Sequence, residues 1–181
     1  MAKKILFLGA APTQMPPLRY AREQGHHVIT CDYLPENPGH ALANESYNVS
    51  TTDKEAILDL AQRKRIDAAY REALRDVPGI RCLQDAGENV ANYSYFPLLV
   101  EADYPLNRDA LYQKLKDNNI FARRYFYPLI TDFPMYRGMP SAHRENLPVA
   151  TAAAQKVICL PIYPTLNSQD LQRVIDIIRR N

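Results

Sequence analysis

The sequence is poor in glycine. It contains 6 Gly against 14 Pro in 181 residues, whereas average proteins contain more glycine than proline. Loops that bind phosphate are usually rich in glycine, because the backbone must approach the ligand closely. Only Gly9 stands where such a loop is expected. The scarcity of glycine therefore argues against a complete, self-contained site for a phosphorylated cofactor.

The chain also has few cysteines, no long apolar run and no excess of one charge. The apolar stretch after Lys4 is too short for a signal peptide or a membrane span, so we expect a cytoplasmic protein without a membrane partner. With 22 basic and 20 acidic side chains, no basic tract is available to bind nucleic acid. The cysteines and histidines show no metal-ligand spacing, so we expect no metal site. We predict reduced core thiols at Cys31, Cys82 and Cys159.

Apolar residues make up 46% and charged residues 23% of the chain, as in an ordinary globular protein with one domain or two small ones. An apolar run at residues 4–9 stops at a small-residue loop, helical spacing follows, and residues 27–32 form a second apolar run ending in Asp32. This order predicts a βαβ unit with a parallel sheet of the Rossmann-like kind. A short third strand is expected at residues 45–49.

Residues 52–74 depart from a doubly wound pattern. Thr52 and Asp53 mark a helix start, but the apolar residues before position 62 and those after position 65 lie on opposite helical faces, about 180° apart at 100° per residue. A doubly wound fold would require a strand at residues 66–69, where the sequence instead favours helix. We interpret the change of face as a seam between two domains, residues 1–66 and 67–181.

The second half predicts an α+β domain. Strands are expected at residues 80–83, 93–100 and 157–162, with an extended aromatic segment at 121–129 and a loop at 131–146. Asn107 and Asn167 are N-cap residues for two helices, the second with Leu171, Val174, Ile175 and Ile178 on its inner face, and a further helix begins near Pro148. The fold class is therefore α/β at the N-terminus and α+β beyond it.

A first candidate site follows the first strand. A strand that ends in glycine and leads into a helix N-terminus can bind an anion, and an acidic residue at the end of the next strand often contacts a ribose. These patterns make Gly9, Ala10 and Asp32 candidate cofactor-binding residues for a nucleotide. The loop is not GxGxxG, however, and the alternative role for an Asp at a strand end is to cap a loop.

A second candidate site is the aromatic segment. Arg binds phosphate with paired hydrogen bonds and Tyr offers a flat face with a hydroxyl tip, so a phosphorylated or sugar-bearing ligand is expected there. A strand edge with snorkelling arginines is the alternative. No Walker A loop, HExxH or nucleophile elbow is present, and we assign no catalytic residue. The candidate substrate-binding residues are Arg123, Arg124, Tyr125, Tyr127 and His143.

Two family resemblances cover different parts of the chain. Residues 3–68, from the run Lys3–Ala11 through Thr51–Ile57, resemble the N-terminal Rossmann-like domain of carbamoyl-phosphate-synthase-like ATP-grasp ligases, which makes ATP a candidate ligand. Residues 62–181 are similar to the C-terminal small domain of the DegT/DnrJ/EryC1/StrS nucleotide-sugar aminotransferases. The residues that carry the second resemblance are 70–80, 92–98, 122–129 and 147–164.

The second resemblance implies descent from enzymes that use pyridoxal phosphate (PLP) to transfer an amino group to a keto nucleotide sugar. That family's large domain, with the Schiff-base lysine, has no counterpart in the sequence, and without the lysine the resting cofactor linkage cannot form. We therefore expect no cofactor bound by this chain alone and leave open whether it is an enzyme. Expected partners are a nucleotide sugar or nucleotide, a second copy, or a separate PLP domain. The alternative is a non-catalytic nucleotide- or partner-binding fusion protein related to ATP-grasp ligases.

Overall fold

The computed structural model describes residues 1–83, 91–125 and 127–180. The chain forms two compact units. One is built on Met1–Ala61 and the other on residues 62–83 and 93–180. The units therefore divide five residues before the expected boundary, because Ile66 already belongs to the core of the second unit.

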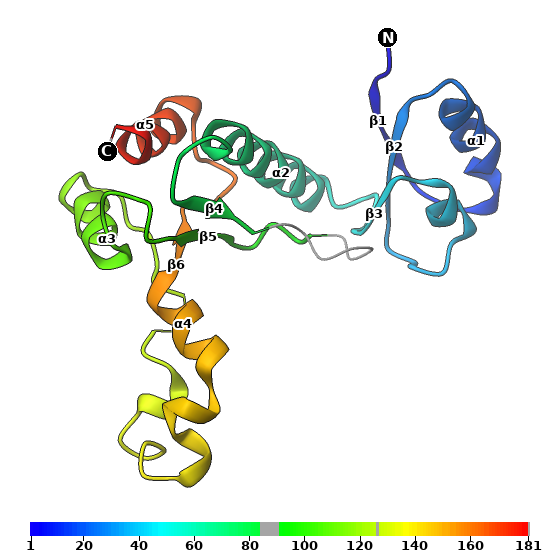
Figure 1. Cartoon of the computed structure of the whole chain (residues 1–181). Helices are drawn as coiled ribbons and strands as arrows, with labels where there is room; N and C mark the ends of the chain where they lie inside the picture. The colour runs from blue at the N-terminus through cyan, green and yellow to red at the C-terminus, as the bar shows by residue number, and fades with distance from the viewer. Residues whose placement is uncertain (84–90, 126, 181) are drawn as a thin grey trace. The chain divides into compact units, whose positions relative to one another are not determined.

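The N-terminal unit is a parallel sheet of three strands in the order β1 (Lys4–Leu8), β2 (His27–Asp32) and β3 (Glu45–Asn48) (Figure 1). Helix α1 (Met15–Glu23) connects β1 to β2, so the βαβ unit is confirmed. The α1 side chains Leu18 and Ala21 pack on Val28. Gly25, with φ of 73°, lets the chain turn out of α1 toward β2, a conformation that favours glycine.

Helix α2 (Lys54–Leu74) runs without interruption, and no strand forms at residues 66–69, as predicted. Asp53 caps its start, where Oδ1 accepts a hydrogen bond from the Ala56 amide at 2.9 Å. The buried positions of α2 lie in its second half, at Ile66, Asp67, Tyr70 and Leu74. The change of apolar face thus reflects packing of the second half on a different core.

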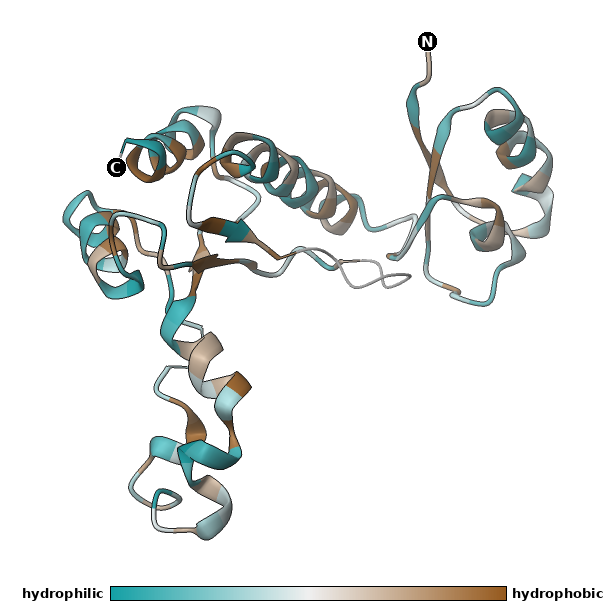
Figure 2. Ribbon diagram, in the orientation of Figure 1, coloured by the Kyte–Doolittle hydropathy of each residue, from teal (hydrophilic) through white to brown (hydrophobic). Residues whose placement is uncertain are grey.

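The C-terminal unit contains an antiparallel sheet of β4 (Ile80–Cys82), β5 (Phe96–Val100) and β6 (Val157–Leu160), with β5 in the centre. The second half of α2 and helices α3 (Arg108–Asp117) and α5 (Ser168–Arg179) share one apolar core with it. Figure 2 shows the apolar residues concentrated in these strands. Asn107 and Asn167 cap α3 and α5 as predicted, each accepting a hydrogen bond from a backbone amide three residues later. The inner face of α5 is buried as expected.

The aromatic segment does not form the expected extended strand. Only Arg123 pairs with β6, through its amide to the Cys159 carbonyl at 2.9 Å and the reverse bond at 2.8 Å. The chain then leaves the sheet, because Arg124 and Tyr127 pack elsewhere and Pro128 has no amide hydrogen to donate.

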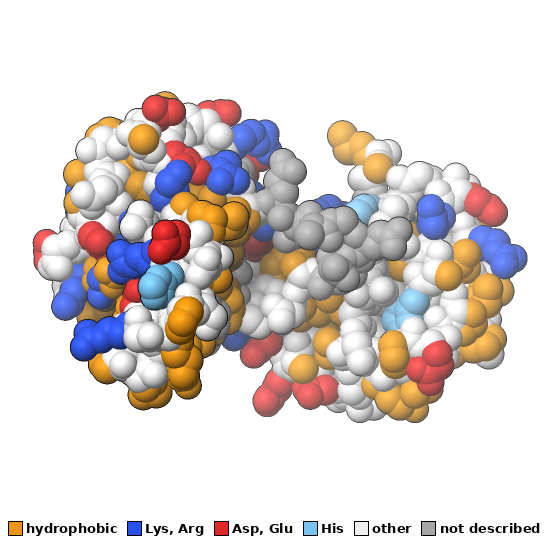
Figure 3. Space-filling view, turned by 60° about the horizontal axis from the view of Figure 1, so that its bottom comes forward, with side chains coloured by type: hydrophobic (Ala, Val, Ile, Leu, Met, Phe, Trp, Pro, Cys, Tyr) orange, Lys and Arg blue, Asp and Glu red, His pale blue; other side chains and the backbone are white. Residues whose placement is uncertain are grey.

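Helix α4 (Pro148–Lys156) precedes β6, and three short 3-10 turns, Ile130–Asp132, Pro140–Ala142 and Arg144–Asn146, occupy the expected loop. The stretch from residue 130 to 149 places several apolar side chains at the surface of the C-terminal unit (Figure 3). Val149 and Met135 are the most exposed of them, at 81% and 70%.

The three cysteines are free thiols, and Cys31 and Cys159 are buried, as predicted, whereas Cys82 is only half-buried at the edge of the core. Of the helices in the described part of the chain, none combines the length and the apolar character that a membrane crossing requires.

Candidate functional site

The loop after β1 was the first candidate site, and its amides are already engaged within the chain. Gly9 donates to the Cys31 carbonyl at 2.7 Å, and Ala10 donates to Asp32 Oδ2 at 2.8 Å. The next amide, of Ala11, donates to Gln14 Oε1 at 3.0 Å. A phosphate would have to displace these acceptors to bind here.

The start of α1 offers no replacement donors. The Met15 amide donates to the Pro12 carbonyl, and the next two residues are Pro16 and Pro17, which have no amide hydrogen. A helix N-terminus binds anions through its free amides. The anion site expected from the strand–loop–helix order therefore lacks its usual donors.

The Asp32 carboxylate holds the loop together. Besides Ala10 it accepts hydrogen bonds from the Leu34 amide at 3.1 Å and from Asn37 Nδ2 at 2.8 Å. Burial raises the pKa of Asp32, but the Leu34, Ala10 and Asn37 hydrogen bonds outweigh it, so the pKa lies below its ordinary value. The geometry matches a carboxylate that caps a loop. The assignment of Gly9, Ala10 and Asp32 to a nucleotide stays a prediction.

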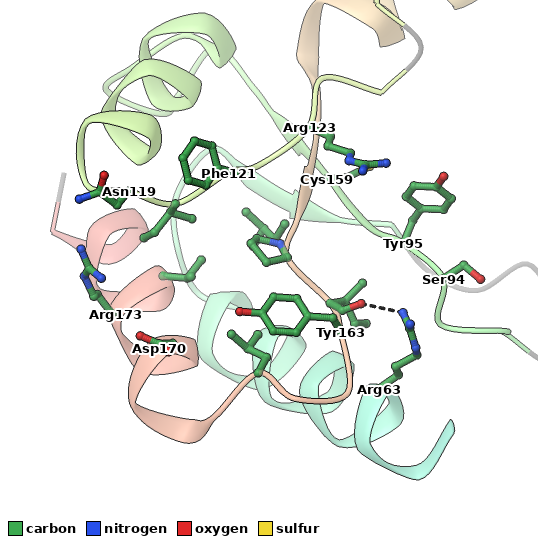
Figure 4. A pocket seen from close by; sticks show the side chains of 16 residues that line it. Arg63, Ser94, Tyr95, Asn119, Phe121, Arg123, Cys159, Tyr163, Asp170 and Arg173 are labelled. Carbon is green, nitrogen blue, oxygen red and sulfur yellow. Dashed lines mark hydrogen bonds between the residues drawn. The ribbon is translucent and has the colours of Figure 1, made fainter. Parts of the chain in front are cut away.

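The C-terminal unit contains a pocket of about 730 Å³. Residues from α2, β6 and α5 line it, together with the segments around residues 95 and 121 (Figure 4). Its volume lies within the range of small-molecule sites. Three arginines and one aspartate are the charged residues of its lining, namely Arg63, Arg123, Arg173 and Asp170.

One end of this pocket is basic. Arg63 comes from α2 and donates through Nη1 to the Ile162 carbonyl at 2.7 Å, which fixes its side chain at the wall. Arg123 lies at the same end of the pocket with Tyr95 and Ser94 (Figure 4). The backbone pairing of Arg123 with Cys159 fixes its position beside β6.

The opposite end carries mixed polar groups. Asn119, Asp170 and Arg173 lie there together (Figure 4). Arg173 donates through Nη2 to the Asn118 carbonyl at 2.5 Å, and Asp170 Oδ2 accepts from Asn167 Nδ2 at 2.7 Å. Hydrogen-bond donors and an anionic acceptor are therefore available side by side.

Between the two ends the pocket is largely apolar, with Leu160, Ile162, Leu166 and Val174 among its lining residues. Cys159 also lines the pocket, beside Arg123 (Figure 4). Burial raises the pKa of Cys159 to about 11, although the nearby Arg123 guanidinium acts in the opposite direction. The thiol is therefore neutral at physiological pH and behaves as an apolar surface.

The remaining residues of the aromatic segment form a separate stack. The Tyr127 ring contacts two guanidinium groups, with Arg108 Cζ and Arg124 Cζ each 4.6 Å from the ring centroid. Arg124 also lies 5.0 Å over the Tyr112 ring and 3.5 Å from Asp109 Oδ1. We call this group the Tyr127 stack. It holds the chain next to Arg123 by cation–π contacts.

Sequence reasoning thus grouped residues that the fold separates. Arg123 lines the pocket, and Tyr125 makes an edge-on contact with the lining residue Tyr95 at 5.5 Å between ring centroids. Arg124 and Tyr127 belong to the stack. His143 lies apart in a 3-10 turn region, with its Nδ1 3.4 Å from Glu145 Oε1.

Several pocket residues were not expected from the sequence. Arg63 lies in a basic run that suggested only a domain seam, and Arg173 lies on an amphipathic helix where an exposed arginine is ordinary. No local pattern could have joined them, because they are 110 positions apart in the sequence. The unexpected residues include Arg63, Tyr95, Phe121, Tyr163, Asp170 and Arg173.

The pocket does not fit PLP as a resident cofactor. PLP enzymes hold it through a lysine amine, and no lysine is found among the residues that line this pocket. In the described ranges, no three His, Cys, Asp or Glu side chains are grouped to hold a metal ion. The chemistry that the lining can supply is binding of an anionic ligand.

Comparison with known proteins identifies the class. The model of the DegT/DnrJ/EryC1/StrS aminotransferase family matches residues 56–179, and the chain belongs to this family. The matched region contains the pocket and the Tyr127 stack. The family resemblance of the C-terminal part is therefore confirmed.

Individual relatives support this family membership. The chain is 44% identical over 119 residues to a dTDP-4-amino-4,6-dideoxy-D-glucose transaminase of Escherichia coli, covering 66% of this chain and 32% of that protein. It thus spans about a third of the length of this curated relative. A putative sugar aminotransferase from Streptococcus pneumoniae, Spr1654 in its PMP form, has the same fold over 67% of this chain and 30% of its own, with a TM-score of 0.59 and 21% identity.

A different kind of relative also matches. Over 61 residues, 34% of this chain, the sequence is 36% identical to a formate-dependent phosphoribosylglycinamide formyltransferase of Wolinella succinogenes, of which the match covers 16%.

Proposed function

We propose that the chain binds a nucleotide-linked sugar as the substrate-side part of a transaminase in amino-sugar biosynthesis. The observation that carries this proposal is that Arg123, within the region matched to the family, lines a pocket with other guanidinium groups. Guanidinium groups bind phosphate oxygens with paired hydrogen bonds. Aromatic rings at the same pocket, Tyr95 and Tyr163, offer flat faces for a base or a sugar.

The amino transfer itself is assigned to no residue of this chain. PLP, which family membership implies, supplies that chemistry when it is linked to a lysine, and the pocket lining offers none. Arg123 and its neighbours would orient the substrate by its charged part. We therefore expect the purified chain to show no visible absorbance of bound PLP that borohydride abolishes.

A partner would complete such a site. We propose either a second copy of the chain or a separately encoded PLP domain. The apolar side chains exposed at Ile130, Met135, Met139 and Val149 support an interaction surface on the C-terminal unit. Size-exclusion chromatography with light scattering tests this, and a monodisperse monomer that recruits no PLP protein would contradict it.

The alternative hypothesis is a nucleotide-binding fusion protein related to ATP-grasp ligases. It places ATP at the loop after β1, where the amides of Gly9 and Ala10 are engaged within the chain. Calorimetry with ATP and Mg²⁺ tests it, and we expect no heat of binding.

Titration of the full chain with dTDP-glucose by isothermal calorimetry tests the main proposal. We expect binding, and we expect Arg123→Ala to weaken it by about ten- to a hundredfold, since hydrogen bonds to charged groups contribute about 1.5–3 kcal/mol. Arg144→Ala is the matched control, because Arg144 is exposed and pairs with Asp132 outside the pocket. Absence of binding by the wild-type chain would refute the proposal.

A further inference from the structure

One buried arginine outside the pocket contacts two segments of the C-terminal unit that are far apart in the sequence. Arg108, the first residue of α3, is 3% exposed. It is not among the described residues that line the pocket. A charged side chain is rarely buried unless its hydrogen-bond donors are used. The contacts of Arg108 therefore indicate its role.

The chain makes a long excursion from the sheet of the C-terminal unit between Arg123 and Val157. We call residues 124–156 the arm. It contains the three 3-10 turns and α4, and it extends away from the sheet (Figure 1). Its two ends lie side by side, because Arg123 and Cys159 are joined by backbone hydrogen bonds of 2.9 and 2.8 Å. A side chain that contacts both ends would restrain the arm as a whole.

Arg108 binds the end at which the arm returns to the sheet. Its Nη1 donates to the Ala154 carbonyl at 2.9 Å and to the Val157 carbonyl at 3.2 Å. Because α4 ends at Lys156, the Ala154 carbonyl has no helical amide from which to accept. The helix dipole also favours a cation at a helix C-terminus. The guanidinium thus caps α4 where the chain enters β6.

The same guanidinium contacts the end at which the arm leaves the sheet. Arg108 Cζ lies 4.6 Å from the centroid of the Tyr127 ring, and Tyr127 is four residues beyond Arg123. Arg108 Nε lies 2.9 Å from Asp109 Oδ1, and the same oxygen lies 3.5 Å from Arg124 Nη1. Asp109 therefore supplies a counter-charge to both guanidinium groups of the Tyr127 stack.

We propose that Arg108 is a positioning residue that joins the two ends of the arm and thereby fixes Arg123 at the pocket. Its contacts lie four residues after Arg123 and two residues before Cys159, so they enclose the backbone pair that holds Arg123 beside β6. The effect on a ligand rests on the proposed function. The effect on the arm does not depend on it.

Arginine suits this role better than other polar residues. A guanidinium is planar, so it can lie over a ring while its edge donates to carbonyls. A lysine ammonium can donate to the carbonyls but has no flat face to place over Tyr127. Glutamine removes the charge, and its single amide cannot replace both contacts. We therefore expect the Gln variant to be impaired more than the Lys variant.

Hydrogen exchange of the full chain tests the role of Arg108 in the arm. We expect Arg108→Gln to lower the protection of the α4 amides at least about tenfold, because the charge-assisted bonds to two carbonyls are lost. Helix α5 should stay protected over the same labelling time, and Arg108→Lys should fall between Arg108→Gln and the wild type. Arg144→Gln is the matched control and should change nothing, because Arg144 lies on the arm, is exposed and pairs with Asp132.

Calorimetry of the same variants with dTDP-glucose tests the effect on Arg123. We expect Arg108→Gln to weaken binding about three- to tenfold, less than Arg123→Ala, because Arg108 acts only through the position of Arg123. Arg108→Lys should restore most of the affinity, and Arg144→Gln should bind like the wild type. If the wild-type chain does not bind dTDP-glucose, the proposed function fails, and the exchange of α4 alone decides whether Arg108 fixes the arm.

Three results would overturn this inference while the proposed function stands. The first is α4 protection in Arg108→Gln equal to that of the wild type, and the second is a loss of protection in α4 and α5 together. The third is unchanged dTDP-glucose affinity in Arg108→Gln. If circular dichroism shows that Arg108→Gln does not fold, Arg108→Lys decides: weaker α4 protection with α5 still protected supports the inference, and wild-type protection overturns it.

Discussion

The Tyr127 stack offers a direct test of how the aromatic segment is held. Replacing Tyr127 with Leu removes the ring that contacts Arg108 and Arg124 and keeps an apolar side chain. The Tyr127 side chain is 44% exposed, while Arg108 is 3% exposed. The two cation–π contacts therefore differ in how much water surrounds them.

The expected loss follows from this difference. A cation–π contact at an exposed site contributes about 0.5–1 kcal/mol and a desolvated one about 2 kcal/mol. With Arg124 at the lower value and Arg108 nearer the upper one, we expect Tyr127→Leu to lower the free energy of unfolding of the C-terminal unit by about 2 kcal/mol. With a urea m-value of about 2 kcal/mol/M, the midpoint falls by about 1 M.

The unfolding of the C-terminal unit must be measured separately from that of the N-terminal unit. Urea unfolding followed by hydrogen exchange of peptides from β5 and β6 provides this readout. Tyr127→Phe keeps the ring and is the control, for which we expect a change below about 0.5 kcal/mol. The reasoning fails if the Leu variant is as stable as wild type, or if the Phe variant loses as much as the Leu variant.

Three further predictions concern stability. Gly79→Ala should destabilise the C-terminal unit by more than about 2 kcal/mol in the same urea assay, because Gly79 has φ of 74° and a Cβ there would lie 2.0 Å from a backbone nitrogen. Gly138→Ala is the control and should be nearly neutral, because a Cβ at Gly138 would meet no atom within 4 Å. Because the pKa of Cys159 is raised to about 11 in the folded protein, its contribution to stability is fully present below the ordinary thiol pKa of about 8.5 and is lost as the pH rises toward about 11. Cys159→Ala should therefore weaken the dependence of the free energy of unfolding on pH between pH 8 and 10. An unchanged slope would contradict this. Hydrogen bonds from Lys156 and Arg81 lower the pKa of Glu101, so the contribution of Glu101 to the free energy of unfolding is present above pH 4.5 and is lost on acidification. Glu101→Gln should therefore reduce the loss of stability at acidic pH. An identical dependence of stability on pH in the variant and the wild type would contradict this.

Much of the local structure could be predicted because it depends on neighbouring residues. The caps at Asn107 and Asn167 and the inner face of α5 follow from patterns within one or two helical turns. The absence of a strand at residues 66–69 followed from helix propensity. The prediction of a strand after Arg123 was wrong, because the conformation of that segment depends on contacts with Arg108 and Tyr112, which no local sequence pattern connects to it.

By itself the sequence determined the order of elements, the βαβ unit, the free thiols and membership of the C-terminal part in an aminotransferase family. These properties rest on periodicity, capping and residue types, which are local or cumulative along the chain. The tertiary structure alone decided that the amides after β1 are engaged, and that Arg63 and Arg173 share a pocket with Arg123. The scarcity of glycine was visible from the start. Packing alone brings these arginine side chains together from distant positions of the chain.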